Sequence, residues 1–152
     1  MVILNDFCFV KHQFIEMLTA YFPEVDAGIP EDIIRGKLVE LIQSQYEQGI
    51  IRICIAFDAG QAIGFSIFQM DTPKSDWCKR PGWGFIREFY IRPPFRGQGR
   101  GRELASYTEL AMAQMGAKQM YLTSGSAIPF WKSCGWKETG QLSSNGLYIL
   151  EK

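Results

Sequence analysis

Glycines and arginines alternate in one short stretch of the chain, which we call the glycine loop: Arg96-Gly97-Gln98-Gly99-Arg100-Gly101, with Arg102 directly after it. An apolar run at residues 85–91 precedes the loop, and a run with helical periodicity follows it. We therefore expect a strand, the loop and a helix in that order. Glycines let successive backbone N–H groups point into one concavity, and a helix start adds partial positive charge. The combination is suited to binding phosphate oxygens, and the arginines add full positive charges.

Two common phosphate-binding patterns do not fit this stretch. The chain has no Gly-x-x-x-x-Gly-Lys-Ser/Thr run, which excludes that type of nucleoside-triphosphate loop. It also has no Gly-x-Gly-x-x-Gly in an early strand–turn–helix unit followed by an acidic residue at ribose distance, so a dinucleotide-binding fold is poorly supported. What remains is Arg-x-x-Gly-x-Gly, read from Arg96 to Gly101.

This pattern resembles the pyrophosphate-binding segment of the GNAT superfamily of N-acetyltransferases, which carry Gln/Arg-x-x-Gly-x-Gly/Ala and bind acetyl-coenzyme A there. Residues 88–97 are similar to the strand, proline and Tyr/Phe-Arg-Gly approach of that family, and residues 127–136 to its Ala-x-x-x-Tyr-x-x-x-Gly-Phe signature. The resemblance covers residues 50–150 well and the first fifty loosely. It implies an α/β (α+β) GNAT fold: a mixed, mostly antiparallel central sheet of about six or seven strands, about four flanking helices, and strands that splay at the cofactor site.

The resemblance also implies an activity, namely acetyl-coenzyme A-dependent transfer of an acetyl group to a primary amine by direct attack in a ternary complex. The acceptor amine stays unidentified. The loop would hold the pyrophosphate, and the exposed backbone of the preceding strand would pair with the pantetheine arm. The implied cofactor-binding residues are Phe89, Tyr90, Ile91, Arg96, Gly97, Gln98, Gly99, Arg100, Gly101, Arg102, Thr123, Ser124 and Trp131.

Acetyl transfer to an amine needs a neutral nitrogen, stabilisation of the charge on the thioester oxygen, and a proton for the leaving thiolate. Glu88 is the candidate general base, because many family members place a strand carboxylate eight positions before the loop arginine. An ion pair with a neighbouring arginine is the equal alternative for this side chain. The backbone N–H near Tyr90 or Ile91 is the expected donor to the thioester oxygen.

The third requirement marks a departure from the family. Trp131 stands where relatives commonly have a tyrosine that protonates the thiolate, and an indole N–H is not a useful acid. Ser124 stands where many relatives have an asparagine. Solvent, Tyr90 and Tyr148 are the remaining proton sources, and a thiol pKa of about 8.5 also tolerates an unprotonated leaving group. The alternative class is a coenzyme A-binding or sensing module that transfers slowly or not at all.

Composition sets further limits. The length of 152 residues predicts one domain, residues 1–152. The sixteen basic and sixteen acidic side chains cancel, and this balance disfavours nucleic acid as a partner, including RNA bound along the arginines. No apolar run is long enough to span a membrane and no signal pattern opens the chain, so we expect a cytoplasmic protein. For the oligomeric state, we expect a monomer or a homodimer. Four scattered cysteines and a single histidine predict no metal site.

Hydrophobic periodicity predicts the remaining elements. Helices are expected near residues 7–22, where Pro23 would end the first one, and near 30–46, 102–115 and 128–134. The third helix should bury Leu104, Tyr107, Leu110, Ala111 and Met115. Strands are expected at 2–4, 51–57, 63–68, 85–91 and 119–123, with a two-residue hairpin at Asn145-Gly146 between 136–142 and 147–150. In the loop 71–82, Trp77 would either face the acceptor pocket or pack beneath the loop.

Overall fold

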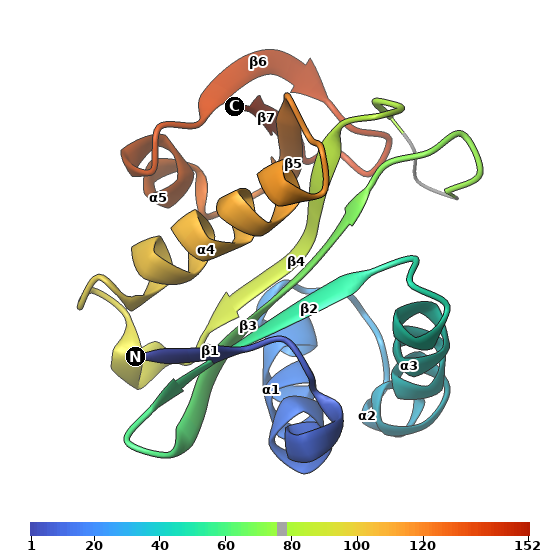
Figure 1. Cartoon of the computed structure of the whole chain (residues 1–152), viewed down its shortest axis with the longest axis vertical. Coiled ribbons are helices and arrows are strands. Elements are labelled where there is room, and N and C mark those ends of the chain that lie inside the picture. The colour runs from blue at the N-terminus through green and yellow to red at the C-terminus, as the bar shows by residue number, and fades with distance from the viewer. Residues whose placement is uncertain (76–78) are drawn as a thin grey trace. The chain divides into compact units, whose positions relative to one another are not determined.

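The computed structural model of the chain describes residues 1–75 and 79–152 (Figure 1). Seven strands form one mixed sheet in the order β1-β2-β3-β4-β5-β7-β6. β4 pairs with β5 in parallel, whereas β1 with β2, β5 with β7, and β6 with β7 are antiparallel pairs. The predicted mixed sheet is therefore confirmed. Trp77, for which the sequence suggested a place near the acceptor or beneath the loop, lies outside the described residues, as do Asp76 and Cys78.

The described residues pack as two compact units. Unit 1 comprises Met1–Ile67 and Glu88–Leu104, and unit 2 comprises Phe68–Arg87 and Ala105–Lys152. Each unit combines segments that are distant in the sequence, because β3, β4 and α4 contribute residues to both. The interpretation of residues 1–152 as a single domain stays a prediction.

Unit 1 holds the N-terminal helices and the first strands. Its elements are β1 (Val2–Leu4), a short 3-10 turn (Cys8–Val10), α1 (Lys11–Glu24), α2 (Glu31–Ile33), a π-helical turn η2 (Ile34–Leu38), α3 (Val39–Glu47), β2 (Arg52–Asp58), most of β3 (Gln61–Met70), the end of β4 (Gly84–Ile91) and a second 3-10 turn η3 (Pro93–Phe95). Apolar side chains of α1 and α3 pack against alternating side chains of β2 and β3 in one core cluster. This cluster fixes α1 over the strands that lead toward the glycine loop.

Two helix predictions need correction. Pro23 lies inside the last turn of α1, which ends at Glu24, because a proline there removes only its own N–H while Val25 still donates to the Tyr21 carbonyl at 3.1 Å. The single helix expected near 30–46 is divided into α2, η2 and α3. Gly36 lies within η2, where its weak helix propensity allows the wider π-helical turn.

Unit 2 contains most of α4 (Arg100–Gln114), β5 (Met120–Ser124), α5 (Ile128–Ser133), β6 (Lys137–Leu142) and β7 (Tyr148–Glu151). In Figure 1, β5, β7 and β6 lie side by side, as their pairing requires. The predicted apolar face of α4 is wrong in part: Leu110 is 57% exposed, and the buried residues are Leu104, Ala105, Thr108 and Met112. These four follow the same spacing of three and four, which Thr108 satisfies with its methyl group.

The turn between β6 and β7 is also longer than predicted. Ser143 donates its backbone N–H to the Leu147 carbonyl at 2.8 Å, so Ser144 lies in the turn with Asn145 and Gly146. Gly146 adopts a φ of 81°, which a glycine accommodates without strain. Among the described residues, no helix combines the length and the apolar character needed to cross a membrane.

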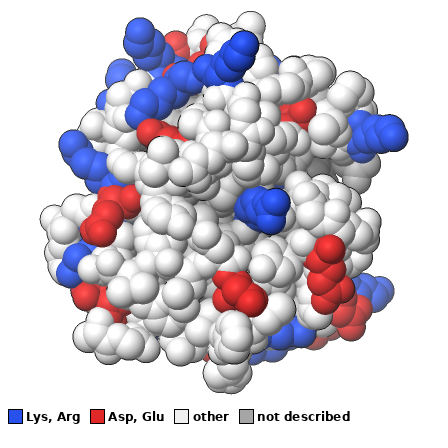
Figure 2. Space-filling model, viewed as in Figure 1, with Lys and Arg blue, Asp and Glu red and all other residues white. Residues whose placement is uncertain are grey.

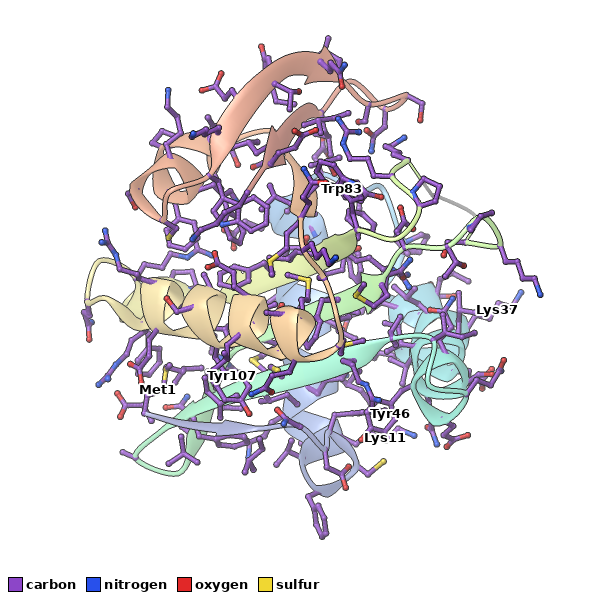
Figure 3. All side chains as sticks on the ribbon, turned by 45° about the horizontal axis from the view of Figure 1, so that its top comes forward. Met1, Lys11, Lys37, Tyr46, Trp83 and Tyr107 are labelled. Atoms are coloured by element: carbon purple, nitrogen blue, oxygen red, sulfur yellow. The ribbon has the colours of Figure 1, made fainter. Side chains whose placement is uncertain are left out.

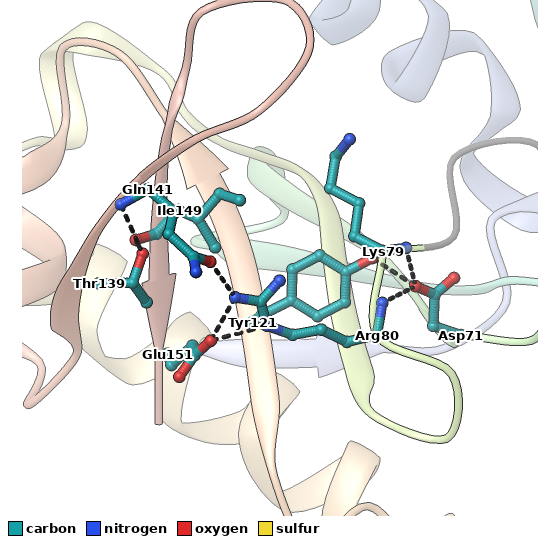
Figure 4. Close-up of polar contacts among 8 residues, drawn as sticks. All are labelled: Asp71, Lys79, Arg80, Tyr121, Thr139, Gln141, Ile149 and Glu151. Carbon is teal, nitrogen blue, oxygen red and sulfur yellow. Dashed lines mark hydrogen bonds and ion pairs between the residues drawn. The ribbon is translucent and has the colours of Figure 1, made fainter.

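A buried carboxylate organises the β3–β4 side of unit 2 (Figure 4). Asp71 is 1% exposed and accepts hydrogen bonds from the Tyr121 hydroxyl and from the backbone N–H groups of Lys79, at 3.0 Å, and Arg80, at 3.3 Å. The Arg80 side chain continues the network to Glu151, with Nε 2.6 Å from Oε1. These bonds tie the start and the end of the segment between β3 and β4 to β5 and β7.

Candidate active site

The glycine loop is exposed and has the backbone geometry of a phosphate-binding turn. Gly97 and Gly99 have φ values of +73° and +82°, and a Cβ built on either would meet no atom within 4 Å. The helix α4 starts at Arg100, two positions before the residue at which we expected it, so Gly101 lies in its first turn. The Glu103 N–H donates to the Gly99 carbonyl at 3.1 Å. The N–H groups before Glu103 therefore have no acceptor within the helix and can bind a ligand.

Arg96 contacts protein groups on three sides. Its Nη2 lies 2.6 Å from Glu24 Oε1, its Nε donates to the Ile91 carbonyl at 2.7 Å, and its guanidinium carbon lies 5.6 Å from the ring centroid of Tyr90. The first residue of the loop is thus tied to the end of α1 and to the end of β4. The proposed contact of Arg96 with phosphate stays a prediction.

Arg100 and Gln98 are also anchored. Arg100 Nη2 lies 2.7 Å from Asp58 Oδ2, and Gln98 donates its side-chain amide to the Pro94 carbonyl at 2.9 Å. The Nε of Arg100 is buried and has no hydrogen-bond partner among the described residues. Such an atom is costly unless a further acceptor reaches it. The loop therefore combines anchored side chains with one buried donor, the Arg100 Nε, that can still form a hydrogen bond to a ligand.

Glu88 lies on β4, half-buried, and is held by a residue that the sequence did not single out. The hydroxyl of Tyr21 on α1 lies 2.5 Å from Glu88 Oε2. Tyr21 is 9% exposed, and burial raises the pKa of its phenol, with further raising by the Glu88 charge and by their hydrogen bond. The phenol therefore keeps its proton and donates a hydrogen bond to the carboxylate.

One signal for Tyr21 is present in the sequence. Its position belongs to the buried stripe of α1 with Phe14, Met17 and Leu18, and it alone in that stripe carries a hydroxyl. A buried hydroxyl needs a partner, so a polar group on a facing strand could have been expected. The sequence could not say which strand faces it.

Tyr90 points into the core of unit 1. It is 4% exposed, and its ring centroid lies 5.6 Å from that of Tyr21 and 5.8 Å from that of Phe65. Burial raises the pKa of Tyr90, as does Glu24, while Arg96 and Arg92 lower it. Behind it, Gly64 on β3 lets β4 approach closely: a Cβ there would clash with the Tyr90 carbonyl oxygen and lie 2.5 Å from Ile91 Cδ1.

Phe89 and Arg102 belong to unit 1, whereas Thr123, Ser124 and Trp131 belong to unit 2. Thr123 and Ser124 pair with Ile149 and Tyr148 across the β5–β7 ladder, and Ser124 Oγ accepts the Ala127 N–H at 3.3 Å. Trp131 is 4% exposed, with ring centroids of Phe130 and Trp136 at 4.9 Å and 5.6 Å. The ladder between β4 and β5 pairs Gly84–Ile86 with Met120–Leu122, although β4 runs on to Ile91 and β5 to Ser124.

A separate hollow in unit 2 has a volume of about 700 Å³, and its lining includes Arg80, Trp83, Lys137, Thr139 and Glu151. Trp83 is labelled in Figure 3. None of the predicted site residues belongs to this lining. On the face drawn in Figure 2, basic and acidic side chains are interspersed, in keeping with the net charge of zero. Within the described residues, no group of three or more His, Cys, Asp or Glu side chains is arranged to hold a metal ion.

Comparison with known families identifies the class of protein. Residues 12–136 match the model of the acetyltransferase (GNAT) family. The chain belongs to this family, whose members acetylate with acetyl-coenzyme A, and it is an N-acetyltransferase by class. The resemblance inferred from the three segments is confirmed, as is the fold. A search of the curated proteins finds no match.

Solved structures with the same fold include three N-acetyltransferases with different names. The PaiA N-acetyltransferase from Thermoplasma acidophilum, in complex with coenzyme A, is 20% identical, with a TM-score of 0.73 over 100% of this chain and 99% of that one. An aminoglycoside 6′-N-acetyltransferase complexed with coenzyme A is 16% identical, with a TM-score of 0.76 over 100% and 96%. The ribosomal-protein-alanine N-acetyltransferase from Brucella melitensis is 16% identical, with a TM-score of 0.71 over 100% and 99%.

Proposed function

We propose that this acetyltransferase transfers the acetyl group to a primary amine, which attacks the thioester directly while both substrates are bound. The observation that carries the proposal is the junction of β4, the exposed glycine loop and the start of α4, with Glu88 on the same strand. One element would hold the cofactor and the same element would present the base. Acetyl-coenzyme A supplies the activated acyl group when bound, and this chain's residues hold and orient it.

The loop fits the pyrophosphate. With positive φ at Gly97 and Gly99 and open space at both Cβ positions, phosphate oxygens can approach the backbone closely. The first turn of α4 adds N–H groups and the positive end of the helix dipole. The buried Nε of Arg100 supports the assignment, since an anion would give this donor an acceptor.

The end of β4 fits the pantetheine arm and the thioester oxygen. The Arg92 N–H donates to the Ile63 carbonyl at 2.8 Å, which directs it toward β3. Backbone groups alternate along a strand, so the Ile91 N–H is directed toward the opposite edge. The Ile91 carbonyl, which accepts from Arg96, supports this direction. We assign the Ile91 N–H to the thioester oxygen and the Phe89 carbonyl to an amide N–H of the pantetheine arm.

Glu88 is the proposed general base. Its carboxylate is half-buried and accepts a hydrogen bond from Tyr21 with one oxygen, and a carboxylate offers about four lone-pair positions. It can therefore accept a proton from the amine directly or through one water molecule. For the leaving thiolate we assign the proton to solvent, because the Tyr90 ring is buried in the core and its raised pKa makes it a weak acid.

The acceptor is proposed only as a primary amine. The names of the similar structures specify an aminoglycoside in one case and the alanine of a ribosomal protein in another. Identities of 16% carry no acceptor across to this chain. The cytoplasmic location and the state of monomer or homodimer stay predictions as well.

The test begins with calorimetric titration of the protein with acetyl-coenzyme A, its dephospho form and free coenzyme A. Micromolar binding of acetyl-coenzyme A supports the proposal, and binding that is largely kept by the dephospho form, which retains the pyrophosphate, supports the loop assignment. A panel of primary amines, including aminoglycosides, polyamines and peptides with free N-termini, is then screened for amine-dependent thiol release. Failure to bind acetyl-coenzyme A would overturn the proposal.

One observation favours the second candidate, a coenzyme A-binding module with little or no transfer. Trp131 fills the position of the usual proton donor and is enclosed between Phe130 and Trp136. Tight binding of acetyl-coenzyme A without thiol release, with any amine of the panel, would select this candidate. Glu88→Gln separates the two candidates further: in an active enzyme it lowers kcat by about a hundredfold or more and leaves acetyl-coenzyme A affinity nearly unchanged.

A further inference from the structure

Tyr21 joins α1 to the strand that carries the proposed base. Its side chain crosses the core of unit 1, with ring centroids of Phe22, Phe65 and Tyr90 at 5.0 Å, 5.6 Å and 5.6 Å. The hydroxyl lies at the end of this packed ring, 2.5 Å from Glu88 Oε2. Because aromatic neighbours hold the ring, the position of the hydroxyl is set by packing rather than by the hydrogen bond alone.

The hydroxyl also reaches the backbone of β4. A hydrogen bond from the Phe89 backbone lowers the pKa of Tyr21, although burial and Glu88 raise it more. Tyr21 therefore donates to the side chain of one strand residue and is influenced by the backbone of the next.

We propose that Tyr21 is a positioning residue for acetyl transfer, whose hydroxyl holds the Glu88 carboxylate in one orientation and in its ionised form. The proposal rests on the proposed role of Glu88 as general base. Tyr21 is not itself the acid that protonates the leaving thiolate, because its raised pKa makes it a weaker acid than a free phenol. Its effect on the reaction passes through Glu88.

Several charged or titratable groups surround this pair in unit 1, and each retains its charge when the hydroxyl is removed. Glu24 lies one turn further along α1 and raises the pKa of Tyr21. Arg96 pairs with Glu24, and Arg92 and Arg96 both influence the neighbouring Tyr90. The change Tyr21→Phe deletes a neutral donor and leaves this set of charges intact.

The direction of the expected effect follows from the hydrogen bond. A donor to a carboxylate favours the ionised form, so its removal raises the proton affinity of that carboxylate. In Tyr21→Phe, the side-chain carboxyl resonance of Glu88, followed by NMR with isotope-labelled glutamate, should titrate about one pH unit higher than in the unchanged protein. This measurement needs no substrate.

The kinetic counterpart is the acidic limb of the pH profile of kcat/KM. We expect this limb to move in the same direction and by about the same amount, so that activity falls by up to about tenfold at pH values below the limb and recovers as the pH rises above it. In the Glu88→Gln background, Tyr21→Phe should change kcat by less than about twofold, because the two residues act as one unit.

Tyr46→Phe is the matched control. Tyr46, labelled in Figure 3, lies on α3 and packs edge-on against Phe7 in the same core, and its hydroxyl donates to the Asn5 carbonyl at 3.2 Å. Its removal deletes a hydroxyl from unit 1 without touching Glu88. It should leave both the Glu88 titration and the pH profile unchanged, and thermal unfolding of both variants reports any loss of fold.

The outcomes separate this inference from the proposed function. If acetyl transfer occurs and Glu88→Gln abolishes it, but Tyr21→Phe leaves the Glu88 titration and the pH profile unchanged, the inference on Tyr21 is wrong and the function stands. If no amine is acetylated, or if Glu88→Gln has no effect on kcat, the general base is wrong and the inference falls with it. A shift in both measurements for Tyr21→Phe alone supports the inference.

Discussion

Arg96 Nη2 lies 2.6 Å from Glu24 Oε1, so the first residue of the glycine loop is bound to the last residue of α1. Both side chains are partly exposed, at 44% and 41%, and the ion pair itself is worth at most about 1 kcal/mol of stability. The ion pair matters because the Glu24 carboxylate and a bound pyrophosphate would compete for the Arg96 guanidinium. The carboxylate of Glu24 also places a negative charge beside a site proposed for an anion.

Glu24→Gln should therefore tighten acetyl-coenzyme A binding by roughly two- to fivefold at low salt, with the gain shrinking as ionic strength rises. Isothermal titration calorimetry at two salt concentrations measures both effects. Glu31→Gln removes the same charge from unit 1, but its partner is Arg35 at 2.9 Å, outside the loop, and it should leave the affinity unchanged. Weaker binding in Glu24→Gln would mean that the ion pair holds the loop in its binding conformation.

Gly99→Ala tests the loop, and Gly60→Ala, at a glycine with nearly the same φ, is its control. Gly99 and Gly60 have φ values of +82° and +79°, and a Cβ on either meets nothing within 4 Å, so alanine should cost each a similar amount, about 1 kcal/mol of unfolding free energy. Only Gly99 belongs to the loop. We expect Gly99→Ala to weaken acetyl-coenzyme A binding at least tenfold and Gly60→Ala, in the β2–β3 hairpin, to leave it unchanged. Equal affinities in the two folded variants would refute the phosphate assignment.

Local patterns in the sequence predicted most elements because each depends on residues that are close in the chain. The glycine loop, the alternating residues of β2 and β3 and the buried stripe of α1 are of this kind. The η2 turn was missed because Gly36 lowers helix propensity without specifying which irregular form replaces the helix. Leu110 was assigned to the wrong face of α4 because Thr108 competes for the buried position.

The site shows the same limit at longer range. The sequence identified Glu88 and Arg96 by their distance from the glycines, but their partners Tyr21 and Glu24 lie far away in the chain and are brought near only by the packing of α1. No local pattern encodes such a pairing. The arginines of the loop were interpreted only as phosphate ligands, whereas Arg96 and Arg100 also bind carboxylates of other elements.

Gly64→Ala should displace the end of β4. A Cβ at Gly64 would clash with the Tyr90 carbonyl oxygen and lie 2.5 Å from Ile91 Cδ1, so β3 and β4 must move apart. We expect a loss of about 2–3 kcal/mol in unfolding free energy and weaker acetyl-coenzyme A binding in the fraction that folds. Gly36→Ala meets nothing within 4 Å and should instead stabilise the chain by about 0.5–1 kcal/mol. Urea unfolding compares the two, and a Gly64→Ala variant as stable as the unchanged protein would contradict the close approach.

Tyr121→Phe should destabilise the chain without involving the glycine loop. Tyr121 is fully buried, its ring stacks on Phe85 with centroids 4.5 Å apart, and its hydroxyl donates to the buried carboxylate of Asp71. The variant keeps the ring but leaves Asp71 with weaker backbone donors from Lys79 and Arg80, and a lost hydrogen bond to a charged group costs about 1.5–3 kcal/mol.

Urea unfolding of Tyr121→Phe should therefore show a lower midpoint with an unchanged slope. Tyr148→Phe is the control: Tyr148 is 46% exposed, and loss of its hydroxyl should change the free energy of unfolding by less than about 0.5 kcal/mol. Because Asp71 ties the segment before β4 to β5, an equal and small effect of the two changes would mean that the backbone N–H groups and the Gln69 side-chain amide, 3.4 Å from Asp71 Oδ1, hold this carboxylate without the phenol. The larger loss in Tyr121→Phe instead assigns the phenol a structural role that is separate from the chemistry of Glu88.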